Sequence, residues 1–218
     1  MIRADFDKLA LIEEEGWGHN QHYHAFLLRH LPPHCEQSLD IGCGTGAFAR
    51  LLARRSTQVL ALDLSPQMIR LAREHSVFYP NIDFQVADVL EWPFPEAAFD
   101  CIASIATLHH LPFESLLLKM KAALRPGGTL LVLDLFQGEG PGDWLRSGIA
   151  FPVNVLLKLA HGKRLRDPKA VREAWAAHAR HDTYLPVSQV RRICADVLPG
   201  AVVRKHLLWR YSLIWEKP

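Results

Sequence analysis

The sequence has few cysteines and almost no net charge. Its four cysteines stand far apart, at positions 35, 43, 101 and 194, and no two form a C-x-x-C pair. This spacing argues against a zinc site and against a framework of disulfides. A formal net charge of only +2 gives no electrostatic reason to expect a nucleic-acid partner.

Long apolar runs are also absent. The longest candidate, from Ile149 to Ala160, is too short to cross a membrane and is interrupted by Pro152, Asn154 and Lys158. The first residues, MIRADFDKLALIEEEG, are acidic and amphipathic and lack the apolar core and cleavage site of a signal peptide. We therefore expect a cytoplasmic protein with no membrane partner.

The composition is that of one folded domain. The chain has 218 residues, of which 49% are hydrophobic and 22% are charged. This length supports one sizeable core, and the balance of apolar and charged residues argues against disorder.

Short apolar runs alternate with helical patterns between Ser38 and Phe136. This alternation predicts a parallel, doubly wound α/β sheet. The predicted strands are 38–41, 58–62, 82–86, 99–105 and 129–135, and the predicted helices are 47–55, 66 onward and 113–124. Ser65 and Pro66 have the residue types of a helix cap and a first helical position.

The pattern changes after residue 136. Residues 137–185 contain two helical stretches and no strand alternation, so we interpret them as an insertion. A helix at 187–198 and two strand-like runs, 202–208 and 211–215, follow; a tight turn through Trp209 and Arg210 predicts a hairpin at the sheet edge. The expected fold is a Rossmann-like, seven-stranded, mostly parallel sheet with an antiparallel C-terminal hairpin strand and a helical insertion.

A glycine-rich turn, Asp40 to Gly46 (DIGCGTG), follows the first predicted strand. Glycines let the backbone turn sharply and let a ligand approach the main chain closely. Doubly wound sheets bind ligands at this place, where amides at the start of a helix also point outward. The spacing G-x-G-x-G differs from the G-x-G-x-x-G of dinucleotide sites, and the Gly-Lys-Ser/Thr of a phosphate-binding loop is absent. A ligand with an adenosine but no pyrophosphate is therefore expected.

Six motifs in order carry a family resemblance. They are LDIGCGTG at 39–46, ALDLSPQM at 61–68, ADV at 87–89, PFP with FD at 93–100, LHHL at 108–111 and LRPGGTL at 124–130. With these motifs the chain resembles the class I S-adenosylmethionine-dependent methyltransferases, especially their small-molecule branch. The resemblance implies S-adenosylmethionine as cofactor and one methyltransferase domain. Its parts would be an N-terminal helical lid (1–35), a cofactor-binding core (36–136), a substrate-lid insertion (137–185) and a last helix with the hairpin (186–218).

The resemblance implies cofactor contacts in the glycine turn and after the second strand. Gly42, Gly44 and Gly46 would pass beneath the methionine and ribose parts, with Cys43 as a small packed side chain in the same turn. Asp40 would orient the loop or reach the methionine amine. Asp63 would accept hydrogen bonds from both ribose hydroxyls; the alternative, a cap for the next helix, is a role that Ser65 can already fill.

The resemblance also implies contacts with the adenine and the sulfonium. Asp88 would accept a hydrogen bond from the exocyclic amine, although it can also be a turn residue, and the Val89 amide would lie near the ring. Leu64 and Met68 would pack against the adenine. The segment after the fourth strand, with Ser104 and Ile105, would border the reacting sulfonium.

Methyl transfer from a sulfonium needs alignment and exclusion of water more than it needs a base. A general base helps only where the acceptor carries a proton that must leave. His109 and its neighbour His110 follow the fourth strand and are the candidates; packing or hydrogen bonding is the alternative for both. No metal is required, and the sequence gives no sign of one.

Three histidines in GHNQHYH, residues 18–24, raise the question of a metal site. A helix capped by Asn20 and running to about residue 31 would point His22 and His24 to opposite sides, so the three cannot converge on one ion. Because N-terminal helices commonly cover the cofactor in this family, Tyr23 and His19 are expected to face the cofactor, with Tyr23 as a further catalytic candidate.

The insertion has aromatic and aliphatic residues beside basic ones, which would suit a small, anionic acceptor. The alternative for its basic stretch, His161 to Arg166, is a solvated loop. His178 and His181 are expected on one helix, 167–181, and exposed to solvent.

The function that these patterns favour is methyl transfer to O, N or C of a small-molecule acceptor by a monomer or homodimer. Two alternatives remain open: a nucleic-acid methyltransferase, and a protein that binds S-adenosylmethionine without catalysis.

Overall fold

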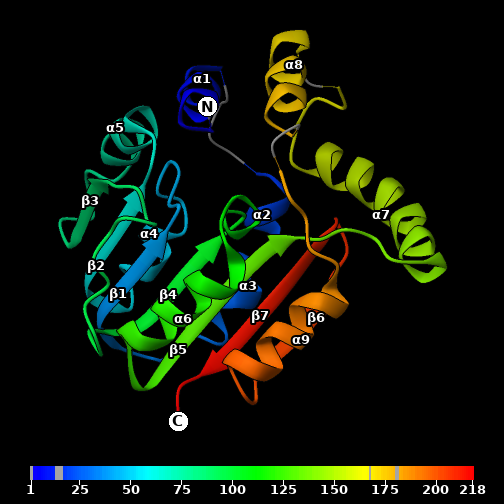
Figure 1. Cartoon of the computed structure of the whole chain (residues 1–218). Helices are drawn as coiled ribbons and strands as arrows, with labels where there is room; N and C mark the ends of the chain where they lie inside the picture. Colours follow the sequence, from blue (N-terminus) through cyan, green and yellow to red (C-terminus); the bar gives the residue numbers. More distant parts are fainter. Residues whose placement is uncertain (1, 13–16, 167, 180–181) are drawn as a thin grey trace.

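A seven-stranded sheet forms the centre of the computed structural model, which describes residues 2–12, 17–166, 168–179 and 182–218 (Figure 1). The strands are β1 (Cys35–Ile41), β2 (Ser56–Asp63), β3 (Ile82–Val86), β4 (Phe99–Ile105), β5 (Leu124–Leu135), β6 (Val202–Lys205) and β7 (Arg210–Glu216). Their order is β3-β2-β1-β4-β5-β7-β6. The first five pair in parallel and β7 runs antiparallel to both of its neighbours, which confirms the predicted fold class.

The strand order reverses at β1. From β1 the chain continues outward through β2 and β3, then returns to place β4 and β5 on the other side. Asp40 of β1 therefore has Ala61 of β2 and Ala103 of β4 as its neighbours across the sheet. Such a switch point leaves a crevice at the carboxyl ends of the central strands.

Helices cover both faces of the sheet. They are α1 (Ile2–Ile12), α2 (His19–His22), α3 (His24–Leu28), α4 (Ala49–Leu52), α5 (Pro66–His75), α6 (Phe113–Ala123), α7 (Pro141–Ala160), α8 (Lys169–His178) and α9 (Val187–Val197). In Figure 1, α6 and α9 lie in front of the sheet and α3 and α4 behind it. Two apolar clusters, one on each face, form the core, as expected where strands are covered on both sides.

The start of α5 agrees with its sequence signal. The Ser65 hydroxyl oxygen accepts a hydrogen bond of 3.1 Å from the Met68 amide, and Pro66 occupies the first helical position. This cap satisfies one of the amide groups that the first turn of a helix leaves without a partner.

The N-terminal helical region differs from the prediction. The predicted single helix is broken at Tyr23 into α2 and α3, and α2 begins after Gly18, which has an extended backbone and provides no side-chain cap. Asn20 is therefore inside the helix rather than at its cap, and its side-chain oxygen accepts a hydrogen bond from Arg210. The break has a reason in packing, because the Tyr23 hydroxyl donates to the Leu207 carbonyl in the hairpin turn.

Other predicted boundaries also move: β1, β2 and β5 begin before the predicted residues 38, 58 and 129. The helix expected at 47–55 is only the short α4, and β6 ends at Lys205 rather than at residue 208. Leu208 and Trp209 form the turn with φ angles of 55° and 58°, so Arg210 is the first residue of β7.

Residues between β5 and α9 form the helices α7 and α8. Figure 1 shows α8 beside α1, above the carboxyl edge of the sheet, while α7 extends away from it. Of the helices in the described ranges, none combines the length and the apolar composition needed to cross a membrane.

The Gly42 position generates a stability prediction. Gly42 has a φ of 70°, and a Cβ atom added there would lie 2.1 Å from the Thr107 hydroxyl oxygen. Gly127 has a similar φ of 75° but open space around the same position, so it is a matched control for backbone strain alone. We expect Gly42→Ala to lower the free energy of unfolding in urea by about 3 kcal/mol and Gly127→Ala by about 1 kcal/mol. If both variants lost the same free energy of unfolding, the Thr107 side chain would move away from the new methyl group at no cost in stability.

Candidate active site

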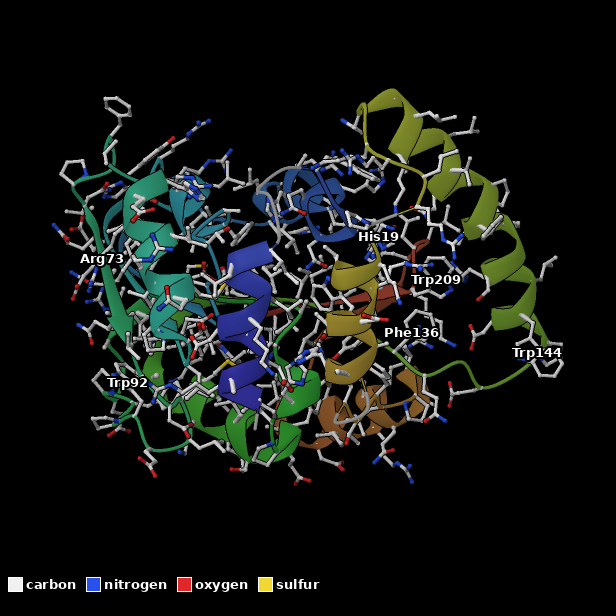
Figure 2. The ribbon with its side chains drawn as sticks, turned by 90° about the horizontal axis from the view of Figure 1, so that it is seen from above. His19, Arg73, Trp92, Phe136, Trp144 and Trp209 are labelled. Atoms are coloured by element: carbon white, nitrogen blue, oxygen red, sulfur yellow. The ribbon has the colours of Figure 1, made fainter. Side chains whose placement is uncertain are left out.

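A cavity of about 1000 Å³ lies at the carboxyl edge of the parallel strands. Its floor is formed by the ends of β1, β2 and β4 and the turns that follow them. Its walls include residues of α1, α2 and α8, the end of α7 with the segment after it, and the start of β7. Figure 2 looks onto this edge, where α1 and α8 stand side by side and contact each other. The cavity thus occupies the crevice that the switch in strand order creates.

The glycine turn forms the centre of the floor. The amides of Gly42 and Cys43 donate to the Leu62 carbonyl at 2.8 and 2.9 Å, which holds the turn against β2. Gly44 has a φ of 53° and no heavy atom within 4 Å of the position that a Cβ would take. Because glycine has no side chain, a ligand can approach the backbone at Gly44 more closely than it could approach any other residue type there.

The three glycines have three different surroundings. An added Cβ at Gly42 would meet Thr107, whereas one at Gly46 would lie 2.9 Å from the Phe84 ring. Gly46 is also not among the residues that line the cavity. Of the three glycines expected beneath the cofactor, Gly42 and Gly44 line the cavity, and Gly46 permits close packing of the turn against β3.

Asp40 has the most unusual electrostatic position in the floor. Its side chain is only 1% exposed, and neither carboxylate oxygen has a hydrogen-bond partner in the described structure. Burial, and secondly the nearby charge of Asp63, raise the pKa of Asp40 from 3.8 to about 7. A buried carboxylate without partners is costly, so this group indicates a site for a ligand that carries donors or positive charge.

Asp63 holds two structural elements together. One carboxylate oxygen accepts a hydrogen bond from the Gly44 amide and the other from the Ser65 amide, both at 2.9 Å. Burial raises the pKa of Asp63 above its usual range, and these two hydrogen bonds oppose the shift. Asp63 thus supports the helix start, which the sequence assigned to Ser65 alone, while it also lines the cavity.

The expected adenine contacts line one side of the cavity. Leu64, Met68, Asp88 and Val89 all face it. One Asp88 carboxylate oxygen accepts a hydrogen bond of 2.9 Å from the Leu90 amide, as in a turn, and the other has no partner within the described ranges. Asp88 therefore is a turn residue and still has an acceptor available for a ligand.

The end of β4 and the turn after it contain residues that face the cavity and one that is fully buried. Ile105, Ala106 and Thr107 line the cavity. Ser104 does not: it is fully buried, and its hydroxyl donates to the Ile41 carbonyl across the sheet at 3.1 Å. The expected cofactor contact of Ser104 is therefore replaced by a bond that joins β4 to β1.

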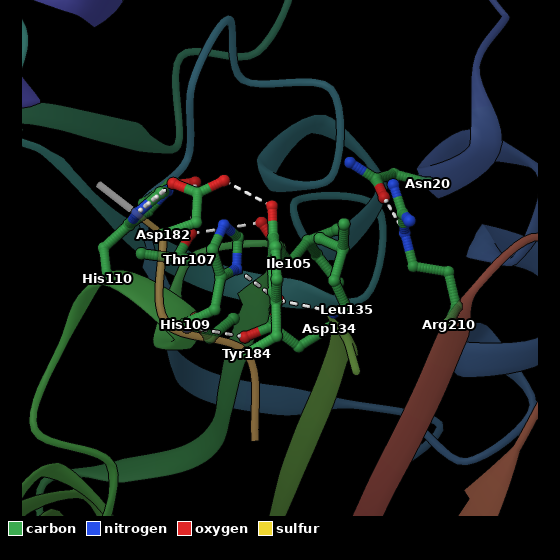
Figure 3. A network of polar contacts seen from close by, with 12 residues as sticks. Asn20, Ile105, Thr107, His109, His110, Asp134, Leu135, Asp182, Tyr184 and Arg210 are labelled. Atoms are coloured by element: carbon green, nitrogen blue, oxygen red, sulfur yellow. Dashed lines mark hydrogen bonds and ion pairs between the residues drawn. The ribbon is translucent and has the colours of Figure 1, made fainter. Parts of the chain in front are cut away.

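His109 is paired with a carboxylate in β5. Its ring Nδ1 lies 2.6 Å from Asp134 Oδ1, and its backbone amide donates to Asp134 Oδ2 at 2.9 Å (Figure 3). Both side chains are buried, at 6% and 1% exposure. Because a carboxylate of this kind accepts hydrogen bonds, the pair favours a proton on Nδ1 and leaves Nε2 as an acceptor.

A second cluster surrounds Asp182. His110 Nδ1 lies 3.2 Å and His178 Nε2 lies 3.7 Å from Asp182 Oδ1, and the Tyr184 hydroxyl donates to the other oxygen. Phe6 of α1 packs edge-on against both histidine rings. Burial, followed by the charge of neighbouring His109, lowers the pKa of His110 to about 4, so His110 is neutral near pH 7. The cluster connects the turn after β4 with α1 and α8.

The same region corrects the expectation for His178. Its side chain is 2% exposed rather than solvated. His181, which was expected beside it, lies outside the described residues. Within the described ranges, His109, His110 and Asp182 are the one group of potential metal ligands whose donor atoms can lie within 4.8 Å of one another.

The GHNQHYH segment places a different set of residues in the cavity than expected. His19 and His24 line it, and His19 Nε2 lies 2.8 Å from Asn154 Oδ1 of α7. Tyr23 does not line it and instead binds the hairpin turn. The structure therefore gives no support to the prediction of Tyr23 as a catalytic and cofactor-facing residue, which stays a prediction. His22 packs against Trp17 and Tyr23 outside the cavity.

The aromatic side chains in the cavity also differ from those expected in the insertion. Trp144 and Phe151 of α7 are 75% and 65% exposed and do not line the cavity. Trp17, Trp175 and Trp209 do, together with the basic residues Lys158, Lys163, Arg164 and Arg210.

The predictions from the sequence did not include Asp134, which holds His109, or the cavity residues Asp182, Tyr184 and Arg210. Asp134 had a signal, since an acid within the apolar run TLLVLDL is unusual. Arg210 had a weaker one, as a charge at the start of a largely apolar strand. Asp182 and Tyr184 follow α8 with no local pattern that marks them.

Comparison with known proteins gives the family. A model of the methyltransferase domain matches residues 39–132. The chain is 30% identical over 209 residues to an uncharacterized methyltransferase of Mycobacterium tuberculosis, covering 94% of this chain and 99% of that protein. It is also 30% identical over 190 residues to a ubiquinone biosynthesis O-methyltransferase of Xanthomonas axonopodis pv. citri, covering 81% and 80% of the two chains.

Solved structures agree in fold. An N-methyltransferase of Bradyrhizobium japonicum in complex with S-adenosylhomocysteine superposes with a TM-score of 0.68 at 18% identity, covering 100% of this chain and 98% of that one. A phosphoethanolamine N-methyltransferase of Haemonchus contortus, also with S-adenosylhomocysteine, gives 0.70 at 18% identity, covering 100% of this chain and 60% of that one. The chain belongs to the class I S-adenosylmethionine-dependent methyltransferases, and S-adenosylmethionine is its cofactor.

Proposed function

We propose that this enzyme transfers a methyl group to an oxygen, nitrogen or carbon atom of a small organic acceptor. The observation that carries the proposal is that one cavity is lined both by the Asp40 carboxylate, which has no hydrogen-bond partner among the described residues, and by His109, whose Nδ1 lies 2.6 Å from Asp134 behind it. Relatives named for ubiquinone biosynthesis, for demethylmenaquinone and for malonyl-acyl carrier protein support an acceptor other than nucleic acid.

The floor of the cavity fits the cofactor. Asp40 offers a buried negative charge for the methionine ammonium, and Gly44 leaves room for close approach of the ligand to the backbone. Asp63, held in place by two amides, would present its remaining lone pairs to the ribose hydroxyls. Leu64, Met68 and Val89 would pack against the adenine, as apolar side chains on that wall.

S-adenosylmethionine supplies a methyl group on an already activated leaving group. The chain then has to align the acceptor and exclude water. The N-terminal residues 1–35 and the insertion 137–185 would do this as two parts of a lid, since α1 and α8 contact each other above the core, 36–136.

His109 is proposed as the general base for an acceptor that loses a proton. Asp134 would fix the ring orientation and the tautomer, so that Nε2 accepts the proton from the acceptor. His110, neutral near pH 7, would position Asp182 and not take part in proton transfer. We propose no metal role for this cluster, because Asp134 already occupies one nitrogen of His109 and the reaction requires no Lewis acid.

Asp40 generates a prediction about pH. Its raised pKa of about 7 means that the ionised form, which attracts the ammonium, becomes populated as the pH rises through 7. The affinity for S-adenosylhomocysteine should rise about tenfold from about pH 6 to about pH 8, with proton release in calorimetry. Asp40→Asn should abolish this slope, and Asp83→Asn, an exposed carboxylate on β3, should retain it. A slope that persists in Asp40→Asn would contradict the assignment.

Asp63 requires a test that separates ribose contact from support of the turn. Affinities of wild type and Asp63→Ala should be compared for S-adenosylhomocysteine and for its 2′,3′-dideoxy analogue. In the wild type, loss of the hydroxyls should weaken binding about a hundredfold, and in Asp63→Ala by less than about threefold. If removal of the hydroxyls weakened binding by the same factor in both proteins, Asp63 would act only by supporting Gly44 and Ser65 and not by contact with the ribose.

Catalysis itself is tested with radiolabelled S-adenosylmethionine and a panel of small hydroxyl, amine and carbon-acid acceptors. We expect methyl transfer to at least one, with kcat reduced about a hundredfold in His109→Gln and Asp134→Asn and cofactor affinity unchanged within about twofold. The surface pair His34–Glu36, 2.9 Å apart, provides the control His34→Gln, which should retain full activity. Intact cofactor binding without transfer to any acceptor would instead favour a non-catalytic binding protein.

A further inference from the structure

Arg210 is a buried cation without an acidic partner. It is 8% exposed, and within the described ranges no carboxylate lies within ion-pair distance of its guanidinium. Its Nε donates to Asn20 Oδ1 at 2.8 Å and its Nη1 to the Leu208 carbonyl at 3.3 Å. A guanidinium has five N–H donors, so these two bonds leave three without a described acceptor.

The remaining donors have access to the cavity, because Arg210 is one of the residues that line it. Asp134 is the carboxylate whose charge raises the pKa of Arg210, and the phenols Tyr184 and Tyr23 also lie near enough to interact with it. Asp134 is already engaged by His109, and Tyr184 and Tyr23 hydroxyls donate to other groups. Burial without a paired anion lowers the pKa of Arg210, which is the mark of a charge that the fold itself does not compensate.

Charge is divided between two parts of the cavity. Three of the acids that line the cavity, Asp40, Asp63 and Asp88, lie at the ends of β1, β2 and β3, where the cofactor is proposed to bind, while a fourth, Asp182, lies against His110 and Tyr184. The basic residues come from other elements: Lys158 at the end of α7, Lys163 and Arg164 after it, and Arg210 at the start of β7. The acidic part suits a cationic cofactor, and the basic part suits an anionic second ligand.

We infer that Arg210 binds the carboxylate of the methyl acceptor, so that the acceptors of this enzyme are small organic acids. The inference rests on the proposed function, since it assumes that the second ligand in the cavity is the acceptor. Figure 3 shows the geometry: Arg210 and His109 lie on either side of Leu135, at the end of β5. An acceptor bound by its carboxylate at Arg210 would direct its reactive group toward His109 and the cofactor.

Arginine suits this role for a physical reason. Its planar group can bind a carboxylate through two parallel hydrogen bonds, and the bond to Asn20 fixes the plane in advance. The competing explanation is that Arg210 only joins α2 to the hairpin turn through Asn20 and Leu208. That role accounts for two donors and requires no anion, so the two explanations differ in one measurable property, the preference for an acid over its amide.

The test is calorimetry with benzoate, 4-hydroxyphenylacetate and hexanoate, each paired with its primary amide, in the presence of saturating S-adenosylhomocysteine. In the wild type we expect at least one acid to bind about tenfold or more tightly than its amide. Arg210→Gln should reduce that acid to the affinity of its amide while the amide changes by less than about twofold. Arg210→Lys, which keeps the charge but loses the planar fork, should retain part of the preference.

Arg125→Gln is the matched control, because Arg125 forms an ion pair with Asp100 at 2.8 Å and does not line the cavity. It should retain the full preference for the acid. No preference in the wild type, a preference that persists in Arg210→Gln, or equal loss in Arg125→Gln would each overturn the inference. Binding of S-adenosylhomocysteine is measured first in every variant, and its absence in the wild type would refute the proposed function itself.

Discussion

The carboxylate of Asp63 is the interaction on which the rest of the site depends. It ties the amide of Gly44, in the turn after β1, to the amide of Ser65, at the start of α5. These two segments would otherwise be connected only through the strands. Because the bond fixes the turn, the backbone at Gly44 is held open toward the cavity. The negative charge that does this also raises the pKa of Asp40, so one side chain shapes the floor and adjusts its electrostatics.

The sequence predicts the parts of the fold that arise from local patterns. Strands β3 and β4 have the predicted bounds, and the cap at Ser65 is confirmed, because periodicity and capping act within a few residues. The helix boundary at Tyr23 differs from the prediction. The sequence pattern indicates one helix, but the structure has α2 and α3, and the Tyr23 hydroxyl donates to the Leu207 carbonyl, far along the chain, which no local pattern indicates.

The residues of the candidate site also divide into those that a local pattern indicates and those that only the folded chain brings together. The cavity floor that we propose for the cofactor has residues at fixed distances from strand ends, such as Asp40 and Asp63, so local patterns could place them in the cavity. The part that we propose for the acceptor could not be predicted, because it is assembled from β5, β7 and the segment after α8, which meet only in the folded chain. Asp134 is the exception, since an acid in an apolar strand is visible without the fold. Arg210 became identifiable only when its burial and its bond to Asn20 were known.

The two halves differ in how their charges are compensated. The carboxylates of Asp134 and Asp182 each have a hydrogen bond with a neighbouring side chain, His109 for the first and Tyr184 for the second. Among the residues that the structure describes, Asp40 and Arg210 have no ion-pair partner, and they line the cavity from different elements, β1 and β7. Unpaired buried charges lower stability, and a folded chain tolerates them where a ligand provides the missing partner. A cationic ligand at Asp40 and an anionic one at Arg210 would each remove one of these penalties. Occupation of the cavity by both ligands should therefore stabilise the fold more than either ligand alone.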